Sequence, residues 1–220
     1  MDAPLPIRTS RPRRPSIFMS NRPRLTLAAL WLIVPTLLVF IDVATQAEYQ
    51  VDYWTHLRQG RLIAELGEIP TTDRITYTIH GRPVLNQNWL GQLFLYELFE
   101  LGGMPLTQFV AALIYAGSIA LVTAVAYARS QNARAAAVAA ILAAACAWTN
   151  FSIRTQTFGI ACFAIVAAAL WLWPRRAWWP LLLLAPVQII WANVHGTFPL
   201  GVVLCLVFAA GRGLDSLKDG

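Results

Sequence analysis

The sequence has few charged residues and few cysteines. Charged residues make up 13% of its 220 positions and apolar residues 57%, whereas an average soluble domain is about 25% charged and roughly 45–50% apolar. The three cysteines stand singly inside apolar runs, which excludes a disulfide framework or zinc site and favours small core side chains. The 13 glycines and 13 prolines do not cluster, so the chain is not of low complexity. This balance predicts a protein dissolved mainly in lipid.

The charges that are present fall into separate regions of the chain. Six arginines lie in the first 24 residues, and eight of the 11 acidic residues lie between Asp42 and Glu100. Because the basic excess comes from one tail and is not spread over a folded face, we expect no nucleic-acid partner. We interpret residues 1–24 as a basic cytoplasmic tail that anchors the first apolar segment.

Long apolar segments recur along the rest of the chain. A helix that crosses the roughly 30 Å hydrocarbon layer needs about 20 mainly apolar residues. We therefore expect an all-α integral membrane protein with about six transmembrane helices. The first is predicted at 25–44, an outer loop at 45–104, a bundle of five further spans at 105–211 and a cytoplasmic end at 212–220. Within the bundle the spans are predicted at 105–128, 135–148, 157–173, 178–192 and 197–210.

Lysine and arginine in the short loops predict the orientation of these spans. The tail and every second loop after it carry basic residues, while the loops after the third and fifth spans hold only Arg154. Because basic residues concentrate on the cytoplasmic side, we expect both termini inside and the loop 45–104 outside. The inner basic residues after the tail are Arg129, Arg134, Arg175, Arg176, Arg212 and Lys218.

The outer loop is predicted to hold two helices at the membrane surface. Asp52 stands as an N-cap before a helical run over 53–66, and Gly67 follows where a helix ends. A second, strongly apolar run over 89–101 is too short to span the membrane, so an interfacial helix fits it best. It follows Asn88 and is stopped by Gly102 and Gly103.

A short β-hairpin is predicted between the two loop helices. Residues 74–79 are rich in threonine, isoleucine and tyrosine, which favour extended backbone. His80 and Gly81 follow as a turn that returns the chain along 82–85.

Asp52 and His56 are the first candidate site residues. They are four positions apart and so share one face of the predicted helix. One interpretation is that Asp52 only caps the helix. A second makes its carboxylate a general base, with His56 orienting it or binding phosphate. A third is that Asp52 and His56 both bind a divalent metal, although two candidate ligands without another support this weakly.

Arg154 and His195 map to the same outer side as the loop. Arginine at such a position needs water, a lipid phosphate or another anion, so snorkelling to the headgroups is one explanation for Arg154. A structural hydrogen bond to the neighbouring turn is one explanation for His195. An acid, an arginine and two histidines on one membrane face together suit an anionic, lipid-linked substrate.

Several runs resemble bacterial GT-C-type polytopic membrane glycosyltransferase-like proteins. The first is Asp52-Tyr-Trp-Thr-His56-Leu-Arg58-Gln-Gly, which is similar to the start of their first outer loop. Arg154 in Ser-Ile-Arg-Thr-Gln-Thr-Phe and His195 in Trp-Ala-Asn-Val-His-Gly continue the likeness. The resemblance extends over residues 50–211 and suggests the N-terminal half of such an enzyme.

The resemblance implies a transferase that takes a sugar from a polyprenyl-phosphate carrier at the extracytoplasmic face of a bacterial inner membrane. Asp52 is then the candidate catalytic base, and the reaction inverts the anomeric carbon. The residues implied in phosphate or sugar binding are His56, Arg58, Arg154 and His195. Implied partners are membrane lipids, the polyprenyl-phosphate sugar and other membrane subunits. No cofactor is implied with certainty, and a divalent metal stays open.

Two features leave other functions open. Related enzymes have longer chains, and many carry a second acid beside the base, whereas the neighbours of Asp52 are Val51 and Tyr53. The alternative is a non-catalytic structural or assembly subunit of a larger membrane complex that retains the fold. A small transporter is less favoured, because the predicted spans hold almost no charge and no internal repeat is present.

Overall fold

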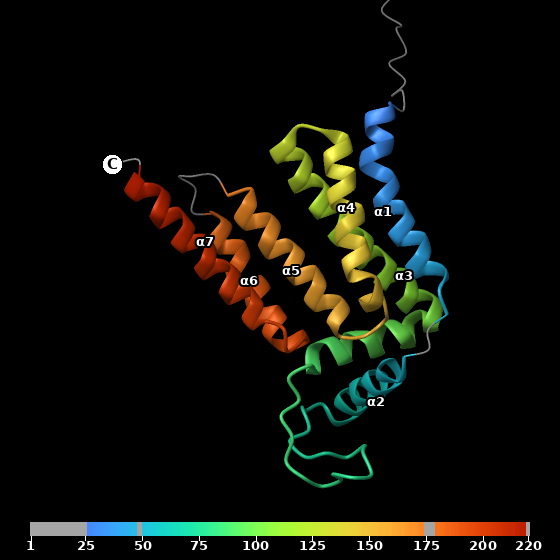
Figure 1. Cartoon of the computed structure of the whole chain (residues 1–220). Coiled ribbons are helices and arrows are strands. Elements are labelled where there is room, and N and C mark those ends of the chain that lie inside the picture. Colours follow the sequence, from blue (N-terminus) through green and yellow to red (C-terminus); the bar gives the residue numbers. More distant parts are fainter. Residues whose placement is uncertain (1–25, 48–49, 174–178, 219–220) are drawn as a thin grey trace, which may run out of the picture.

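The computed structural model describes residues 26–47, 50–173 and 179–218, so the predicted basic tail lies outside it. The other helices form a bundle, and α2 and the first part of α3 lie across one end of it (Figure 1). The elements are α1 (Leu27–Thr45), α2 (Val51–Leu66), α3 (Trp89–Ser130), α4 (Ala133–Ala147), the 3-10 turn η1 (Trp148–Asn150), α5 (Gln156–Trp171), α6 (Trp179–Val194) and α7 (Pro199–Lys218).

Four of the described helices are long and apolar enough to cross a membrane. These are α1, α3, α4 together with η1, and α7. The expectation of about six transmembrane helices is met only in part, because α5 and α6 have 16 residues each, close to the short spans predicted at 157–173 and 178–192. At about 1.5 Å per residue such a helix is roughly 24 Å long, short of the hydrocarbon thickness. The chain is a membrane protein. Of its two short helices, α5 begins just after the turn that carries Arg154, and α6 ends just before His195.

The helix α3 contains a sharp bend that divides it into the two helices predicted from the sequence. At Gly103 the backbone has φ 63° and ψ −161°, a conformation that only glycine adopts readily. Pro105 follows and starts the second part, as proline does in the first turn of a helix. The stop predicted at Gly102 and Gly103 is thus confirmed, and it turns the first part of α3 across the end of the bundle (Figure 1).

The helix α3 organises the apolar core. Among the described elements α3 contacts α1, α2, α4, α5 and α6, whereas α7 contacts only α5 and α6. One cluster of buried residues includes Val43 of α1 and Tyr115 of α3, and a second includes Trp191 of α6. Large apolar side chains such as Leu206 and Val207 of α7 remain exposed. Such faces are expected where the surrounding solvent is lipid rather than water.

The β-hairpin predicted over 74–85 is wrong. The described residues contain no strand, and one isolated antiparallel bridge joins Thr72 to Pro83. The Asp73 carboxylate accepts hydrogen bonds from the amides of Ile75 and Thr76, at 3.1 and 2.8 Å. This local turn competes with extended backbone, and proline has no amide for a longer ladder. Residues 67–88 therefore form an irregular loop.

Close backbone approach holds α2 against the first part of α3. A Cβ atom at Gly60 would clash with the carbonyl oxygen of Gln92 and would lie 2.7 Å from Cβ of Tyr96. The contact is mainly with backbone, which cannot move aside as a flexible side chain can. Gly60 is therefore required for the packing that places α2 at the end of the bundle.

Replacing Gly60 by alanine is expected to destabilise this packing by about 1–3 kcal/mol, the usual cost of overpacking. The melting temperature of the purified protein in detergent should fall accordingly. Gly117→Ala on α3 is the matched control, because a Cβ there meets nothing within 4 Å. A Gly60→Ala protein as stable as the control would contradict the packing described here.

Candidate functional site

Asp52 lies in the first turn of α2 and is not its N-cap. The helix begins at Val51 with Gln50 in the cap position, so the predicted capping role of Asp52 is wrong. Tyr53, in the same turn, is fully buried, so this turn packs into the core. The predicted end is confirmed, since Gly67 has a left-handed φ of 67°. The Asp52 side chain is 60% exposed and faces Arg154, with 3.7 Å between carboxylate Oδ2 and guanidinium Nη1.

Arg154 is presented by a turn that is held from inside the bundle. The hydroxyl of Tyr115 lies 2.6 Å from the carbonyl oxygen of Asn150 and 2.9 Å from that of Ser152. The Gln46 side chain donates a hydrogen bond to the carbonyl of Phe151. These contacts help satisfy the carbonyl groups of residues 150–152, as burial requires. The turn before α5 is therefore fixed, and Arg154 projects from it with 22% of its side chain exposed.

The guanidinium group of Arg154 has donors to spare. Its Nη2 lies 3.4 Å from the Asn150 side-chain oxygen, a long hydrogen bond. The distance to Asp52 is that of an ion pair rather than a strong hydrogen bond. Its buried Nε atom has no partner among the described residues. Arg154 can therefore accept an additional anionic oxygen, and phosphate has the geometry that arginine prefers.

His195 projects from the turn between α6 and α7. Its Nδ1 lies 2.9 Å from the hydroxyl of Thr197 and accepts a 3.3 Å hydrogen bond from the Thr197 amide. Trp191 in turn donates to the Thr197 hydroxyl at 3.1 Å. Because Nδ1 is an acceptor, the neutral ring carries its proton on Nε2 and presents it as a donor.

A tie between α3 and α6 brings this turn to α2. Trp89, the first residue of α3, donates a 2.8 Å hydrogen bond to the side-chain oxygen of Asn193. A Cβ atom at Gly91 would lie 3.1 Å from the carbonyl oxygen of Val194 and 3.0 Å from the Thr155 side chain. The first part of α3 therefore packs against both turns that carry the candidate residues.

His56 stands in a chain of polar side chains from four segments. Asn86 donates to the Gln92 side-chain oxygen at 2.7 Å, so the amide nitrogen of Gln92 faces Nδ1 of His56 at 3.4 Å. The other ring nitrogen lies 3.4 Å from the hydroxyl of Thr155. This pattern favours a neutral His56 protonated on Nε2, because a proton on Nδ1 would oppose the amide donor.

The electrostatics of the site agree with neutral histidines. Burial lowers the pKa of His56 below its ordinary value; the Asp52 carboxylate opposes this, and His195 and Arg154 reinforce it. Burial likewise lowers the pKa of His195, with Arg154 adding to the effect. These mutual influences arise because the residues lie near one another. At neutral pH the site thus has one carboxylate, one guanidinium and two neutral imidazole rings.

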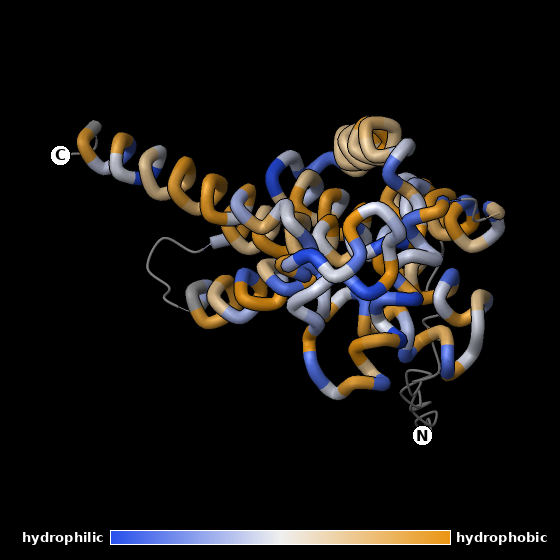
Figure 2. The backbone as a smooth tube through the Cα atoms, turned by 90° about the horizontal axis from the view of Figure 1, so that it is seen from below, coloured by the Kyte–Doolittle hydropathy of each residue, from blue (hydrophilic) through white to orange (hydrophobic). Residues whose placement is uncertain are grey.

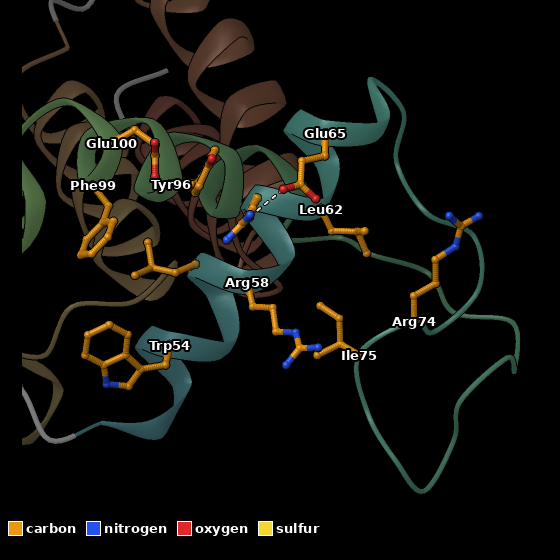
Figure 3. A pocket seen from close by; sticks show the side chains of 11 residues that line it. Trp54, Arg58, Leu62, Glu65, Arg74, Ile75, Tyr96, Phe99 and Glu100 are labelled. Atoms are coloured by element: carbon orange, nitrogen blue, oxygen red, sulfur yellow. Dashed lines mark hydrogen bonds and ion pairs between the residues drawn. The ribbon is translucent and has the colours of Figure 1, made fainter.

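Arg58 is the predicted site residue that does not join the others. It lies on the opposite side of α2, in an open pocket of about 550 Å³ formed with the first part of α3 and the following loop. Figure 3 shows Arg58 pointing toward Ile75, with Trp54 and Phe99 at the other end of the pocket. Helical geometry explains this, because side chains two positions apart point to different faces. The structure thus brings together Asp52, His56, Arg154 and His195, and separates Arg58 from them.

Sequence reasoning missed the residues that orient His56. Gln92 is buried in an otherwise apolar helical run, and a lone amide in such a run is a signal that was available. Thr155 carried no signal, because its role depends on the turn that follows η1. No group of three or more histidine, cysteine or acidic side chains that could hold a metal occurs within the described residues. The described residues therefore offer no ligand set for the divalent metal considered at Asp52 and His56.

Viewed from the α2 end, hydrophilic segments lie mostly toward the centre and hydrophobic helices surround them (Figure 2). The fold and site thus define an all-helical membrane protein with a polar, charged site at one end of its bundle. No protein-family model matches the chain, and comparisons with curated proteins and with solved structures found no significant match.

The histidine interpretation predicts a specific titration. In protein with ¹⁵N-labelled imidazoles, the His56 signal should titrate with a midpoint below about 6.5 and show an unprotonated Nδ1 at neutral pH. Since the folded protein holds this pKa down, stability is retained above pH 6.5 and falls as the pH drops below it. The variants His80→Gln and His195→Gln assign the signals. A His56 midpoint at or above 6.5 contradicts the interpretation.

Proposed function

We propose that the chain is a GT-C-like membrane glycosyltransferase, or the N-terminal half of one, that transfers a sugar from a polyprenyl-phosphate carrier. The observation that supports it is the convergence of Asp52, His56, Arg154 and His195 from three separate parts of an apolar helical chain. Charged and polar groups are costly near lipid, and they usually mark a substrate site. The same four residues lie in the runs that resemble this family.

In the proposed reaction Asp52 is the base. The acceptor hydroxyl attacks the anomeric carbon, its proton passes to the Asp52 carboxylate, and the bond between that carbon and the phosphate oxygen breaks with inversion. The polyprenyl phosphate leaves with the electron pair. Arg154 offsets the charge that grows on the phosphate, and the Nε2–H group of His195 donates a hydrogen bond to a substrate oxygen. His56, oriented by Gln92 and Thr155, lines the site beside the base. The exposure of Asp52 leaves it accessible to an acceptor.

We further propose that all six apolar helices cross a bacterial inner membrane, with both termini cytoplasmic. Arg129 and Arg134 flank the turn between α3 and α4, at the end of the bundle away from α2 (Figure 1). Basic residues at that end favour a cytoplasmic location for it. The candidate site then faces the extracytoplasmic side, and α2 and the first part of α3 lie in the interface. Thinning of the bilayer beside α5 and α6 accommodates their shorter length.

The alternative function is a non-catalytic structural or assembly subunit. The observation in its favour is the ion pair itself, because a carboxylate that faces Arg154 in the resting protein can have a purely structural role. In that case Asp52 and Arg154 would matter for stability and not for turnover.

Asp52→Asn is expected to reduce sugar transfer at least about 100-fold, the lower end of what a general base contributes, while leaving the melting temperature nearly unchanged. The assay uses purified protein with a radiolabelled polyprenyl-phosphate sugar and native membrane extract as the source of acceptor. Glu65→Gln is the matched control, because Glu65 lies on the far side of α2 and pairs with Arg61.

Three outcomes are distinguishable in this assay. Loss of transfer in Asp52→Asn alone supports the transferase. Equal transfer by wild-type protein and Asp52→Asn contradicts the role of the base. No transfer by wild-type protein that copurifies with membrane subunits in fixed ratio favours the structural alternative.

A further inference from the structure

We propose that two apolar grooves at the end of the bundle opposite the candidate site each hold one acyl chain of an anionic phospholipid, with the phosphate at Arg129 in one groove and at Arg212 in the other. This goes beyond the proposed transferase function and does not depend on Asp52. The two grooves are separate, but they share one arrangement of apolar walls and a terminal arginine.

The first groove separates α4 from α5. These two helices, both described over their whole length, have no contact within 8 Å between Cα atoms, although each packs on α3. The space between them is an apolar groove of about 460 Å³, lined by side chains such as Val122, Ala143 and Ala167. It extends along α3 from Ser118 to Arg129, where the guanidinium lies 5.3 Å from the centre of the Trp171 ring.

The second groove is formed by α5, α6 and α7. It has a volume of about 770 Å³ and apolar walls that include Val166, Leu184 and Leu206. Arg212 stands at its end, 5.6 Å from the centre of the Phe208 ring. Arg129 and Arg212 lie near the ends of α3 and α7 that point away from α2 (Figure 1). Two arginines on aromatic rings thus close two apolar grooves at the same end of the bundle.

The size of the grooves argues for a lipid chain and against a helix. From Ser118 to Arg129 the first groove is roughly 16 Å long at 1.5 Å per residue. A helix about 10 Å across and of that length would occupy roughly 1,200 Å³, whereas the first groove holds about 460 Å³, so a helix would lie largely outside it. An acyl chain is narrow enough to fit. Inside the groove its carbons contact the apolar walls more closely than they contact neighbouring chains in the bulk lipid.

The charge of the chain argues for an anionic headgroup. No aspartate or glutamate occurs between residues 101 and 214, the whole segment that forms both grooves. The first acid beyond it is Asp215, in the last turns of α7. Within the described residues no carboxylate lies in ion-pair distance of Arg129. Over the Trp171 ring the Arg129 guanidinium stacks by its face, which leaves its edge donors suited to a phosphate.

The test is native mass spectrometry of the full chain in detergent with added phosphatidylglycerol or phosphatidylcholine of identical acyl chains. We expect up to two phosphatidylglycerol molecules to bind more tightly than phosphatidylcholine. Arg129→Gln and Arg212→Gln should each weaken one of the two sites at least about tenfold, the value of a charged hydrogen bond, and the double variant both. Ala167→Phe should block the first site while both arginines remain.

Arg134→Gln is the control, because Arg134 is exposed at the same end but lines neither groove. Melting temperatures show whether each variant is folded. Three results would overturn the proposal: equal binding of both phospholipids, unchanged binding in the double variant, or displacement of phosphatidylglycerol by an equal amount of polyprenyl phosphate. A protein subunit that copurifies and prevents lipid binding at both grooves would also overturn it.

Discussion

The bend at Gly102 and Gly103 is the constraint on which the rest of the structure depends. A straight α3 would carry its first part away from the bundle, whereas the glycine-only backbone at Gly103 turns it across the bundle end. In that position it receives α2 at Gly60 and contacts the turns before α5 and after α6 through Gly91. Three short-range contacts thus follow from one local conformation, and each positions a different part of the candidate site.

The site combines a rigid frame with chemically available groups. Hydrogen bonds from Tyr115 and Trp191, both buried in the core, fix the turns that carry Arg154 and His195. The frame leaves Asp52 largely exposed and leaves donors on Arg154 unused. Partial burial keeps the two imidazole rings neutral, so they can donate hydrogen bonds without adding positive charge beside Arg154. Such an arrangement is suited to an anion that arrives and leaves.

Sequence reasoning recovered the helical class, the break in α3 and four residues that converge. Apolar runs and glycine positions predict these features because they reflect local backbone preference and the cost of polar groups in lipid. It failed where several local preferences compete. Asp73 turns a β-rich segment into a loop, and α2 begins at Val51, ahead of Asp52.

The position of Arg58 could not be predicted for a related reason. Arg58 belongs to the same run as Asp52, and only the rotation of α2 against α3 decides which face meets the site. Tertiary packing, rather than propensity, determines this. The limits of α5 and α6, by contrast, lie within two residues of the predicted 157–173 and 178–192, because apolar runs mark them.

Thiol cross-linking tests the central claim that α2 meets the turn before α5 on its Asp52 face. In a chain with Cys146, Cys162 and Cys205 replaced by alanine, cysteine is introduced at Thr155 together with either His56 or Arg58. The shortest bifunctional thiol reagents should join positions 155 and 56, whose native side chains lie 3.4 Å apart, and leave positions 155 and 58 unlinked. Equal cross-linking of both pairs, or linkage of the 155 and 58 pair alone, would contradict the account.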